Sequence, residues 1–249
     1  ELEILAVQRN ATHGQQLTQE EKRAYALKWW GIISDDEILS ALSISKKSLD
    51  RYTKTKREEQ EAQIKQQIYD LWLSCETQTN IEQIVKKPQQ TVSDIIAKIT
   101  ENGQVSDTGI FRDFNDEDSP RRIYDIWNFG KATNEVKHFG NIPPEIIENL
   151  LYYYTEPYDV VFDPFGGGGS TIDICIKRKR RYFVSDLNPI PARNDIRKHD
   201  ITTGLPDGLP VPKFVFLDPP YWKQAAGKYS NDSTDLSNVE LEEFLTTIG

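Results

Sequence analysis

The stretch Val160-Val161-Phe162-Asp163-Pro164-Phe165-Gly166-Gly167-Gly168-Gly169-Ser170 decides the fold of this chain. An apolar run that ends in an acid and continues into four glycines predicts a β-strand, a tight turn and a helix. Glycine adopts positive φ without steric cost and lets the backbone approach a ligand closely, so the turn is typical of a nucleotide-type cofactor site. A flexible glycine linker is the alternative, but strand and helix signals flank the glycines directly.

Asp218-Pro219-Pro220-Tyr221-Trp222 is the second informative run, and it follows the first in the chain. The carboxylate again comes at the end of an apolar run, here on a rigid Pro-Pro turn beside an aromatic residue. The two runs together, in this order, carry more weight than either alone.

Alternating strand and helix signals continue on both sides of the glycine turn. The predicted strands are 160–162, 182–185 and 213–217, and the predicted helices are 144–153, 170–179 and 241–248. This alternation indicates an α/β fold with a parallel sheet covered on both faces. Ligands bind such sheets at the carboxyl ends of the strands. We therefore expect one shared site for the acids at these ends, which are Asp163, Asp186, Asp200 and Asp218; for any one of them, a turn or N-cap carboxylate is the alternative.

These motifs resemble those of amino-directed DNA methyltransferases, which use S-adenosylmethionine. The family pattern is Asp-Pro-Phe, any residue, Gly, a small residue, Gly and Thr; it is matched by Asp163, Pro164, Phe165, Gly167 and Gly169, with Ser170 in place of Thr. The resemblance implies a Rossmann-like methyltransferase domain. It also implies that the turn holds the methionine moiety of the cofactor, with Asp163 near its ammonium group.

The resemblance assigns further cofactor contacts. Asp186 lies 23 residues after Asp163 and matches the acid that accepts hydrogen bonds from ribose hydroxyls. Asp200 matches the acid that reads the adenine amino group. Phe139, Asn141 and Pro143 belong to a motif that lies before the glycine turn and packs on the cofactor, although a loop aromatic that covers the core is an equal alternative for Phe139.

The family's catalytic motif corresponds to Asp218, Pro219, Pro220 and Tyr221. An exocyclic base amine is a poor nucleophile because its lone pair is delocalised into the ring. A carboxylate and a proline carbonyl that accept its two N–H bonds localise that pair. The base must leave the duplex to reach the pocket, where Tyr221 can stack on it. The motif has no Cys, which argues against cytosine C5 chemistry.

The first hundred residues have helical rather than strand periodicity. A helix at 19–31 is followed by a capped helix that begins after Ser34, a break at Ser43-Ile44, and a third helix, capped by Ser45, at 46–53. Helices at 64–74, 80–85 and 89–99 repeat the layout. The layout is that of a helix-turn-helix, and its candidate DNA-binding residues are Lys46, Lys47, Arg51, Gln89, Gln90, Thr91 and Ser93. A helical bundle with a solvated basic face is the alternative.

The helical region resembles the helix-turn-helix part of chromosome-partitioning ParB-type proteins, including an opening Arg9-Asn10-Ala11-Thr12-His13-Gly14 similar to the tail of their N-terminal domain. The predicted organisation has four parts. These are a ParB-like tail with the first helix-turn-helix (1–57), a second helix-turn-helix (58–103), a linker (104–121) and the methyltransferase domain (122–249).

Composition and charge limit which other kinds of protein and binding site fit the sequence. The net charge of −9 excludes uniform coating by nucleic acid but not a local basic patch, such as the one in 44–57. The run Lys177–Arg181 can approach phosphates or form a solvated helix end. Two isolated cysteines predict neither a disulfide framework nor a zinc site. We expect a cytoplasmic protein without a membrane span, a signal peptide or a metal.

The sequence thus predicts a bacterial or phage site-specific DNA methyltransferase that binds double-stranded DNA and S-adenosylmethionine. Adenine N6 is the favoured acceptor and cytosine N4 the second. One alternative is a ParB-like DNA-binding or partition protein with a non-catalytic methyltransferase scaffold; another is an RNA or protein methyltransferase. The chain begins at Glu1, contains no Met and stops about thirty residues after Asp218. We therefore expect a piece of a longer protein whose methyltransferase domain is incomplete and inactive by itself.

Overall fold

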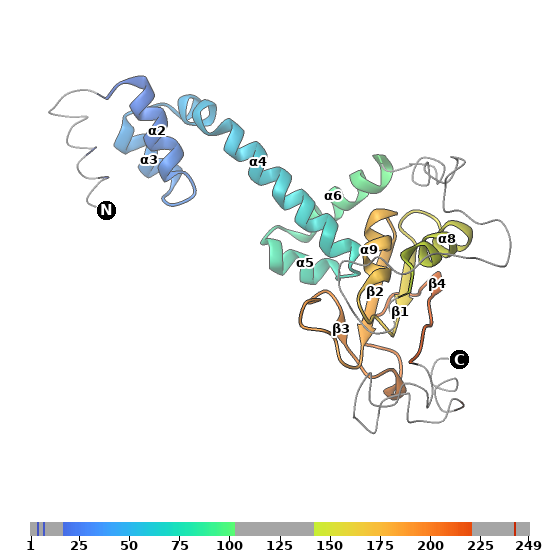
Figure 1. Ribbon diagram of the computed structural model, residues 1–249. Helices are drawn as coiled ribbons and strands as arrows, with labels where there is room; N and C mark the ends of the chain where they lie inside the picture. Colours follow the sequence, from blue (N-terminus) through green and yellow to red (C-terminus); the bar gives the residue numbers. More distant parts are fainter. Residues whose placement is uncertain (1–3, 5–6, 8–16, 103–141, 221–241, 243–249) are drawn as a thin grey trace. The chain divides into compact units, whose positions relative to one another are not determined.

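The computed structural model describes residues 4, 7, 17–102, 142–220 and 242 of the 249. The chain forms two compact units, an N-terminal unit (Glu1–Gln66) and a C-terminal unit (Gln67–Gly249). Figure 1 shows that the described elements of the first are all helical, whereas the second combines helices with a sheet.

Two short helices open the described part of the N-terminal unit, α2 (Gln19–Trp29) and α3 (Asp35–Leu42). The Ser34 hydroxyl accepts a hydrogen bond from the Glu37 amide at 3.3 Å, and the Glu37 carboxylate accepts one from the Ser34 amide at 3.0 Å. This reciprocal capping box satisfies amides that have no partner inside the helix. The cap predicted at Ser34 is confirmed.

The third helix, α4, runs from Lys46 to Leu73 without a break and spans 28 residues. The sequence predicted separate helices at 46–53 and 64–74. The connector between them contains neither Gly nor Pro and is rich in Glu, Gln, Lys and Arg, so nothing in it ends a helix. The predicted break before α4 is confirmed, because Ser43 adopts a left-handed φ of 48°. Ser45 then accepts from the Ser48 amide at 3.2 Å.

The core of the N-terminal unit lies between these three helices. Its buried members are Val7, Ala26, Trp29, Ile38, Ala41, Leu42 and Leu49. α4 passes through the predicted domain boundary between residues 57 and 58.

Two further helices belong to the C-terminal unit. α5 (Gln78–Val85) ends at Lys86, whose φ of 53° reverses the chain, and Pro88 precedes α6 (Gln89–Asn102). Both were predicted as helices, with ends a few residues short. Their buried side chains are Ile81, Val85, Val92 and Ile96. The helix-turn-helix assignment itself stays a prediction.

A sheet of four parallel strands forms the centre of the C-terminal unit, in the order β3-β2-β1-β4. The strands are β1 (Val160–Asp163), β2 (Arg181–Asp186), β3 (Arg197–Lys198) and β4 (Phe214–Val215). The predicted parallel α/β sheet is confirmed. β3 was not predicted, because two charged residues give no strand signal. Of the helix predicted at 241–248, only residue 242 lies inside the described part.

Alternate residues of the strands enter two apolar clusters. Val161, Tyr182 and Val184 pack with the helices α8 (Pro144–Tyr154) and α9 (Ser170–Lys177). Phe162 and Phe183 belong to the second cluster, together with Val160, Cys75 and Ile201. The sheet is therefore buried between two apolar layers, which fixes the position of its carboxyl edge. In the described residues no helix has the length and apolar character that crossing a membrane requires.

Candidate active site

Three predicted acids come together at the carboxyl edge of the sheet. Asp163 is the last residue of β1, and Asp186 is the last of β2. Asp218 follows β4, whose pairing with β1 extends to Phe216 through a 2.8 Å backbone hydrogen bond to Phe162. β2 and β4 lie on opposite sides of β1, so the chain order reverses between β1 and β4. In parallel α/β sheets such a switch point is where ligands bind.

Asp163 is buried and bonded within the chain. One carboxylate oxygen accepts from the Phe165 amide at 2.8 Å, and the other accepts from the Thr171 hydroxyl at 2.6 Å. Burial raises the pKa of Asp163 to about 7; the two hydrogen bonds oppose this rise, and the nearby charges of Asp218 and Asp186 add to it. Asp218 and Asp186 are therefore close enough for their charges to act on the Asp163 carboxyl group. Asp163 thus ties β1 to the first turn of α9.

The glycine turn packs against the chain's own residues as well as bordering the site. Gly166 donates its N–H to the Ser185 carbonyl at 2.8 Å. A Cβ at Gly166 would lie 2.7 Å from Cγ1 of Val184 and 3.0 Å from Cγ2 of Ile196, so any side chain would collide there. Gly166 stands at the motif position that accepts any residue, so the motif does not mark it as a required glycine. Gly169 has a φ of 85°, which favours glycine at the start of α9.

Asp186 is half-buried and holds the turn from the neighbouring strand. Its carboxylate accepts from the Gly167 amide at 3.0 Å and from the Asn188 amide at 2.8 Å. Asp200 accepts from the amide and hydroxyl of Thr202 at 3.0 and 2.7 Å, so it caps the short 3-10 helix η2 (Ile201–Thr203). This turn or N-cap role is the alternative that the sequence left open for Asp200 beside a ligand-binding role. The ribose and adenine assignments stay predictions.

The catalytic motif is described up to Pro220. Asp218 is half-buried, and burial raises the pKa of its carboxyl group. Within the described residues, none of Asp163, Asp186 and Asp218 forms a salt bridge. Tyr221, Phe139 and Asn141 lie outside the described residues. Pro164 is buried beside Asp163, and the half-buried Phe165 packs against the apolar cluster of Phe162.

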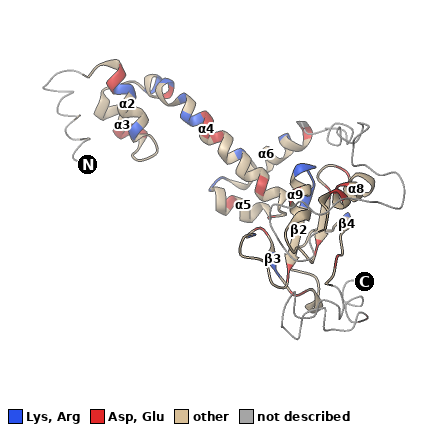
Figure 2. Ribbon diagram, in the orientation of Figure 1, with Lys and Arg blue, Asp and Glu red and all other residues tan. Residues whose placement is uncertain are grey.

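The basic run that begins at the C-terminal end of α9 has a structural role. Figure 2 shows this end of the helix in blue. Arg178 is buried and ion-paired with the buried Glu148 of α8. Arg180 is fully buried; it donates to the Thr155 hydroxyl at 2.9 Å and to the Thr155 carbonyl at 2.6 Å. Both sequence interpretations are wrong for these two arginines, because neither side chain reaches solvent or a phosphate.

Two residues that the sequence did not single out form contacts at the carboxyl edge of the sheet. Thr171 carries the hydroxyl that binds Asp163. Arg193 lies against Gly169 and pairs with Asp173 and Asp195 at 2.8 Å each. No local signal marks Arg193, since its partners come from α9 and from the segment before β3. Residues 17–102, 142–220 and the other described positions contain no group of three or more ligating side chains that could hold a metal.

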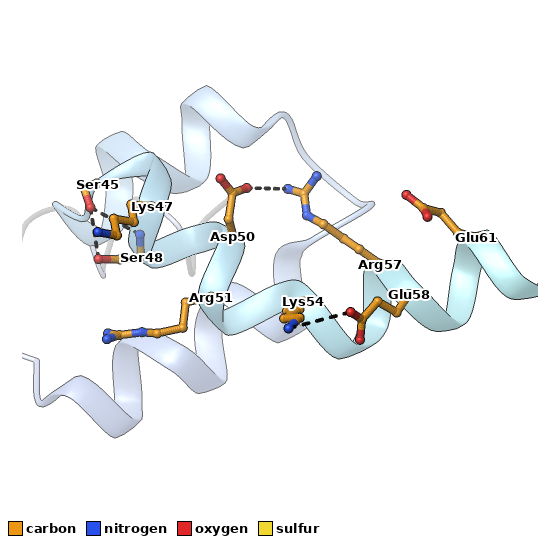
Figure 3. A pocket seen from close by; sticks show the side chains of 9 residues that line it. All are labelled: Ser45, Lys47, Ser48, Asp50, Arg51, Lys54, Arg57, Glu58 and Glu61. Carbon is orange, nitrogen blue, oxygen red and sulfur yellow. Dashed lines mark hydrogen bonds and ion pairs between the residues drawn. The ribbon is translucent and has the colours of Figure 1, made fainter.

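The candidate DNA-binding residues are on helix surfaces. Lys46, Lys47 and Arg51 are exposed at the start of α4. Lys47 and Arg51 line a hollow of about 580 Å³, together with Ser45, Ser48, Asp50, Lys54, Arg57, Glu58 and Glu61 (Figure 3). On α6, Gln89, Gln90 and Thr91 are exposed and Ser93 is half-buried. Gln90 donates to Asp94 at 2.8 Å.

Other basic residues of the same stretch are engaged within the N-terminal unit. Arg57 pairs with Asp35 at 2.8 Å, Lys56 donates to the Leu27 carbonyl at 2.8 Å, and Lys54 lies 3.9 Å from Glu58. Lys54 and Lys56 are exposed as well, so what sets Lys46, Lys47 and Arg51 apart is that no ion pair to them is described. The structure thereby divides a basic stretch that the sequence treats as uniform.

An α/β sheet with acids and a glycine turn at its switch point is the architecture of an α/β methyltransferase, and the sequence comparisons agree. Residues 32–190 match the profile of the N6/N4 DNA methylase family. The chain belongs to this DNA methylase family.

Individual relatives are similar over shorter stretches. The Type II methyltransferase M.XycI of Xanthomonas campestris pv. cyanopsidis is 38% identical over 64 residues, which are 26% of this chain and 21% of the relative. The Type II methyltransferase M.Cfr9I of Citrobacter freundii is 32% identical over 78 residues, 31% of this chain and 26% of the relative. The matched part of the chain thus spans about a quarter or less of these curated relatives. No solved structure matches the chain.

Proposed function

We propose that the chain is the cofactor-binding part of a DNA methyltransferase that moves a methyl group from S-adenosylmethionine to an exocyclic base amine. One observation carries the proposal: Asp163, Asp186 and Asp218 meet at the switch point of a parallel sheet, beside a glycine turn. Membership of the N6/N4 family supports the amine as acceptor. Adenine N6 is the favoured acceptor and cytosine N4 the second.

The chemistry of the edge fits the cofactor. S-adenosylmethionine carries a sulfonium, an ammonium and a carboxylate, so its net charge is positive, and it supplies an electrophilic methyl group. Asp186 and Asp218 are half-buried carboxyl groups without a described salt bridge, and a bound cation would favour their charged forms. Asp186 is half-buried at the glycine turn, where its remaining acceptor capacity can serve ribose hydroxyls. Asp163 lies behind the turn and holds it, while the turn itself borders the methionine moiety.

Asp218 and the Pro219 carbonyl act on the base in this proposal. They accept the two N–H bonds of the amine, which localises its lone pair and aims it at the methyl group. S-adenosylmethionine, when bound, would supply the methyl group and its sulfur would keep the bonding electron pair; the methylated amine held by Asp218 and the Pro219 carbonyl would release one proton to water. Both cysteines are buried, and burial raises the pKa of each thiol, so neither is a candidate nucleophile for C5 chemistry.

Double-stranded DNA is the proposed substrate, and two separate surfaces are proposed to bind it: the start of α4 in the N-terminal unit and α6 in the C-terminal unit. Lys46, Lys47 and Arg51 form the exposed basic surface at the start of α4. Lysine and arginine at such a surface neutralise phosphates. Gln89, Thr91 and Ser93 on α6 offer side chains of the types that bind base edges and phosphates. The two helix-turn-helix units, their likeness to ParB-type proteins and the predicted domain limits belong to this proposal.

Transfer of labelled methyl groups from S-adenosylmethionine to duplex DNA tests the function in the full-length protein. Asp218→Ala should abolish transfer and leave cofactor binding largely intact, because its carboxylate is assigned to the base amine. Asp207→Ala, which removes an exposed carboxylate of the same unit, is the matched control and should keep full activity. Normal turnover in Asp218→Ala would refute the mechanism. Tight duplex binding without transfer by the wild type would favour a non-catalytic scaffold, and label in RNA or protein would favour the third alternative.

A further inference from the structure

The segment between β2 and β3, residues 187–196, contains no helix or strand, yet it lies directly on the glycine turn. Two of its side chains make the contact. Ile196 is buried and would be 3.0 Å from a Cβ placed on Gly166. Arg193 is so close to Gly169 that a Cβ there would lie 2.5 Å from its Cζ. Both glycines are therefore needed for the approach of this segment.

Arg193 is held by three charge-assisted hydrogen bonds. Its Nε and Nη2 donate to the two oxygens of Asp195 at 2.9 and 2.8 Å, and its Nη1 donates to Asp173 at 2.8 Å. The arginine side chain is only 11% exposed, although Asp173 is 56% exposed. Asp195 lies in the segment itself, whereas Asp173 lies in the first turn of α9. The planar guanidinium thus links the segment to the helix that follows the glycine turn, with a geometry that lysine cannot reproduce.

The same segment directly follows Asp186, the last residue of β2. One carboxylate oxygen of Asp186 accepts from Gly167 in the turn, and the other accepts from Asn188 in the segment. The position of this carboxylate consequently depends on how firmly the segment and the turn are held together. Ile196 meets the turn at Gly166, and Arg193 meets it at Gly169.

We propose that Arg193 is a positioning residue of the cofactor site, which clamps residues 187–196 onto the glycine turn and so keeps the Asp186 carboxylate at Gly167. The inference rests on the proposed function, because it assumes that Asp186 contacts the cofactor. Arg193 need not touch the cofactor itself. Supporting residues of this kind affect ligand affinity by about tenfold or more.

Amide hydrogen exchange of the ligand-free chain tests the clamp without any cofactor. In Arg193→Ala the amides of Gly167 and Asn188, both bonded to Asp186, should exchange at least about tenfold faster. Arg193→Lys keeps the charge and one ion pair, so it should restore part of the protection. Arg197→Ala is the matched control: Arg197 also pairs with a carboxylate, Glu76 at 2.9 Å, and its described hydrogen bonds go to Ser74 and Glu76 rather than to the glycine turn or α9. Unchanged exchange of both amides in Arg193→Ala would overturn the clamp.

Calorimetric titration with S-adenosylhomocysteine then tests the consequence for binding. Arg193→Ala should weaken affinity about tenfold, whereas Arg197→Ala should lower the thermal midpoint and keep affinity. In an Asp186→Ala background, Arg193→Ala should cause no further loss, since its effect passes through Asp186. Additive losses, or unchanged affinity in the single variant, would overturn the inference while the proposed function stands. Failure of the wild-type chain to bind would refute the proposed function and this inference together.

Discussion

Two runs of basic residues, 46–57 and 177–181, look alike in the sequence, but their side chains are buried to very different extents in the structure. The first exposes Lys46, Lys47 and Arg51 on a helix surface. In the second, Arg178 and Arg180 are buried and bonded to α8 and the residue that follows it. Charge density alone therefore does not identify a nucleic-acid surface. What decides is whether a buried carboxylate or free carbonyls lie within reach of the basic side chains.

The largest expected effect of this difference is on stability. Arg180→Met removes a fully buried guanidinium and leaves the hydroxyl and carbonyl of Thr155 without their donors. We expect the free energy of unfolding to fall by about 4 kcal/mol, since each buried acceptor that is left without a donor costs about 1–3 kcal/mol. The exposed counterpart, Arg51→Met, should change it by less than about 0.5 kcal/mol. Urea unfolding at 25 °C measures both, and similar losses would contradict the comparison.

The buried carboxyl group of Asp163 extends the contrast between buried and exposed charges to the pH dependence of stability. The pKa of Asp163 is about 7 in the folded chain and 3.8 as its ordinary value, because burial disfavours the charged form. A raised folded-state pKa means that the stability contribution is complete below about pH 4 and is lost as the pH rises through 7. This group alone should lower the free energy of unfolding by about 2.5 kcal/mol between pH 5 and pH 8.

Asp163→Asn isolates that contribution. The amide keeps a similar shape and cannot ionise, so the variant should lose this part of the pH dependence and gain stability relative to the wild type at pH 8. Asp207→Asn, at an exposed position, should follow the wild-type curve. Parallel curves for wild type and Asp163→Asn would show that the carboxyl group titrates normally.

DNA binding gives the smallest expected free-energy change per residue and sharpens the comparison at the exposed run. Lys47→Ala with Arg51→Ala should reduce the slope of log affinity against log salt by about 2, close to one for each lost phosphate contact. Lys56→Ala with Arg57→Ala removes the same formal charge, but both side chains are bonded inside the N-terminal unit. Fluorescence anisotropy with duplex DNA over a salt series should therefore show a much smaller change for this second pair. Equal slopes in the two double variants would show that this basic surface is only solvated and does not contact DNA phosphates.

Local signals were sufficient for much of the fold. The Ser34 cap, the glycine turn and the acids at the strand ends could be read from short patterns, because each depends on residues close in sequence. The continuity of α4 was missed because a charged segment between two apolar patterns was interpreted as a connector.

Contacts between distant residues could not be read in the same way. The burial of Arg178 and Arg180 depends on Glu148 and Thr155, about 30 and 25 residues earlier in the chain. The requirement for glycine at position 166 likewise depends on side chains of β2 and of the segment before β3. Periodicity and motif spacing carry no information about such partners. The roles of Asp200 and Asp218 stay predictions for the same reason, since they concern ligands rather than chain neighbours.

Calorimetric titration of the chain with S-adenosylmethionine measures the proposed cofactor site itself. We expect the wild type to bind one cofactor per chain, Asp186→Ala to weaken binding by at least about tenfold, and Asp207→Ala to bind like the wild type. Asp186 lies at the glycine turn, whereas Asp207 is an exposed carboxylate of the same unit. Equal affinity in the wild type and Asp186→Ala, or no binding by the wild type, would contradict the assignment of the carboxyl edge as the cofactor site.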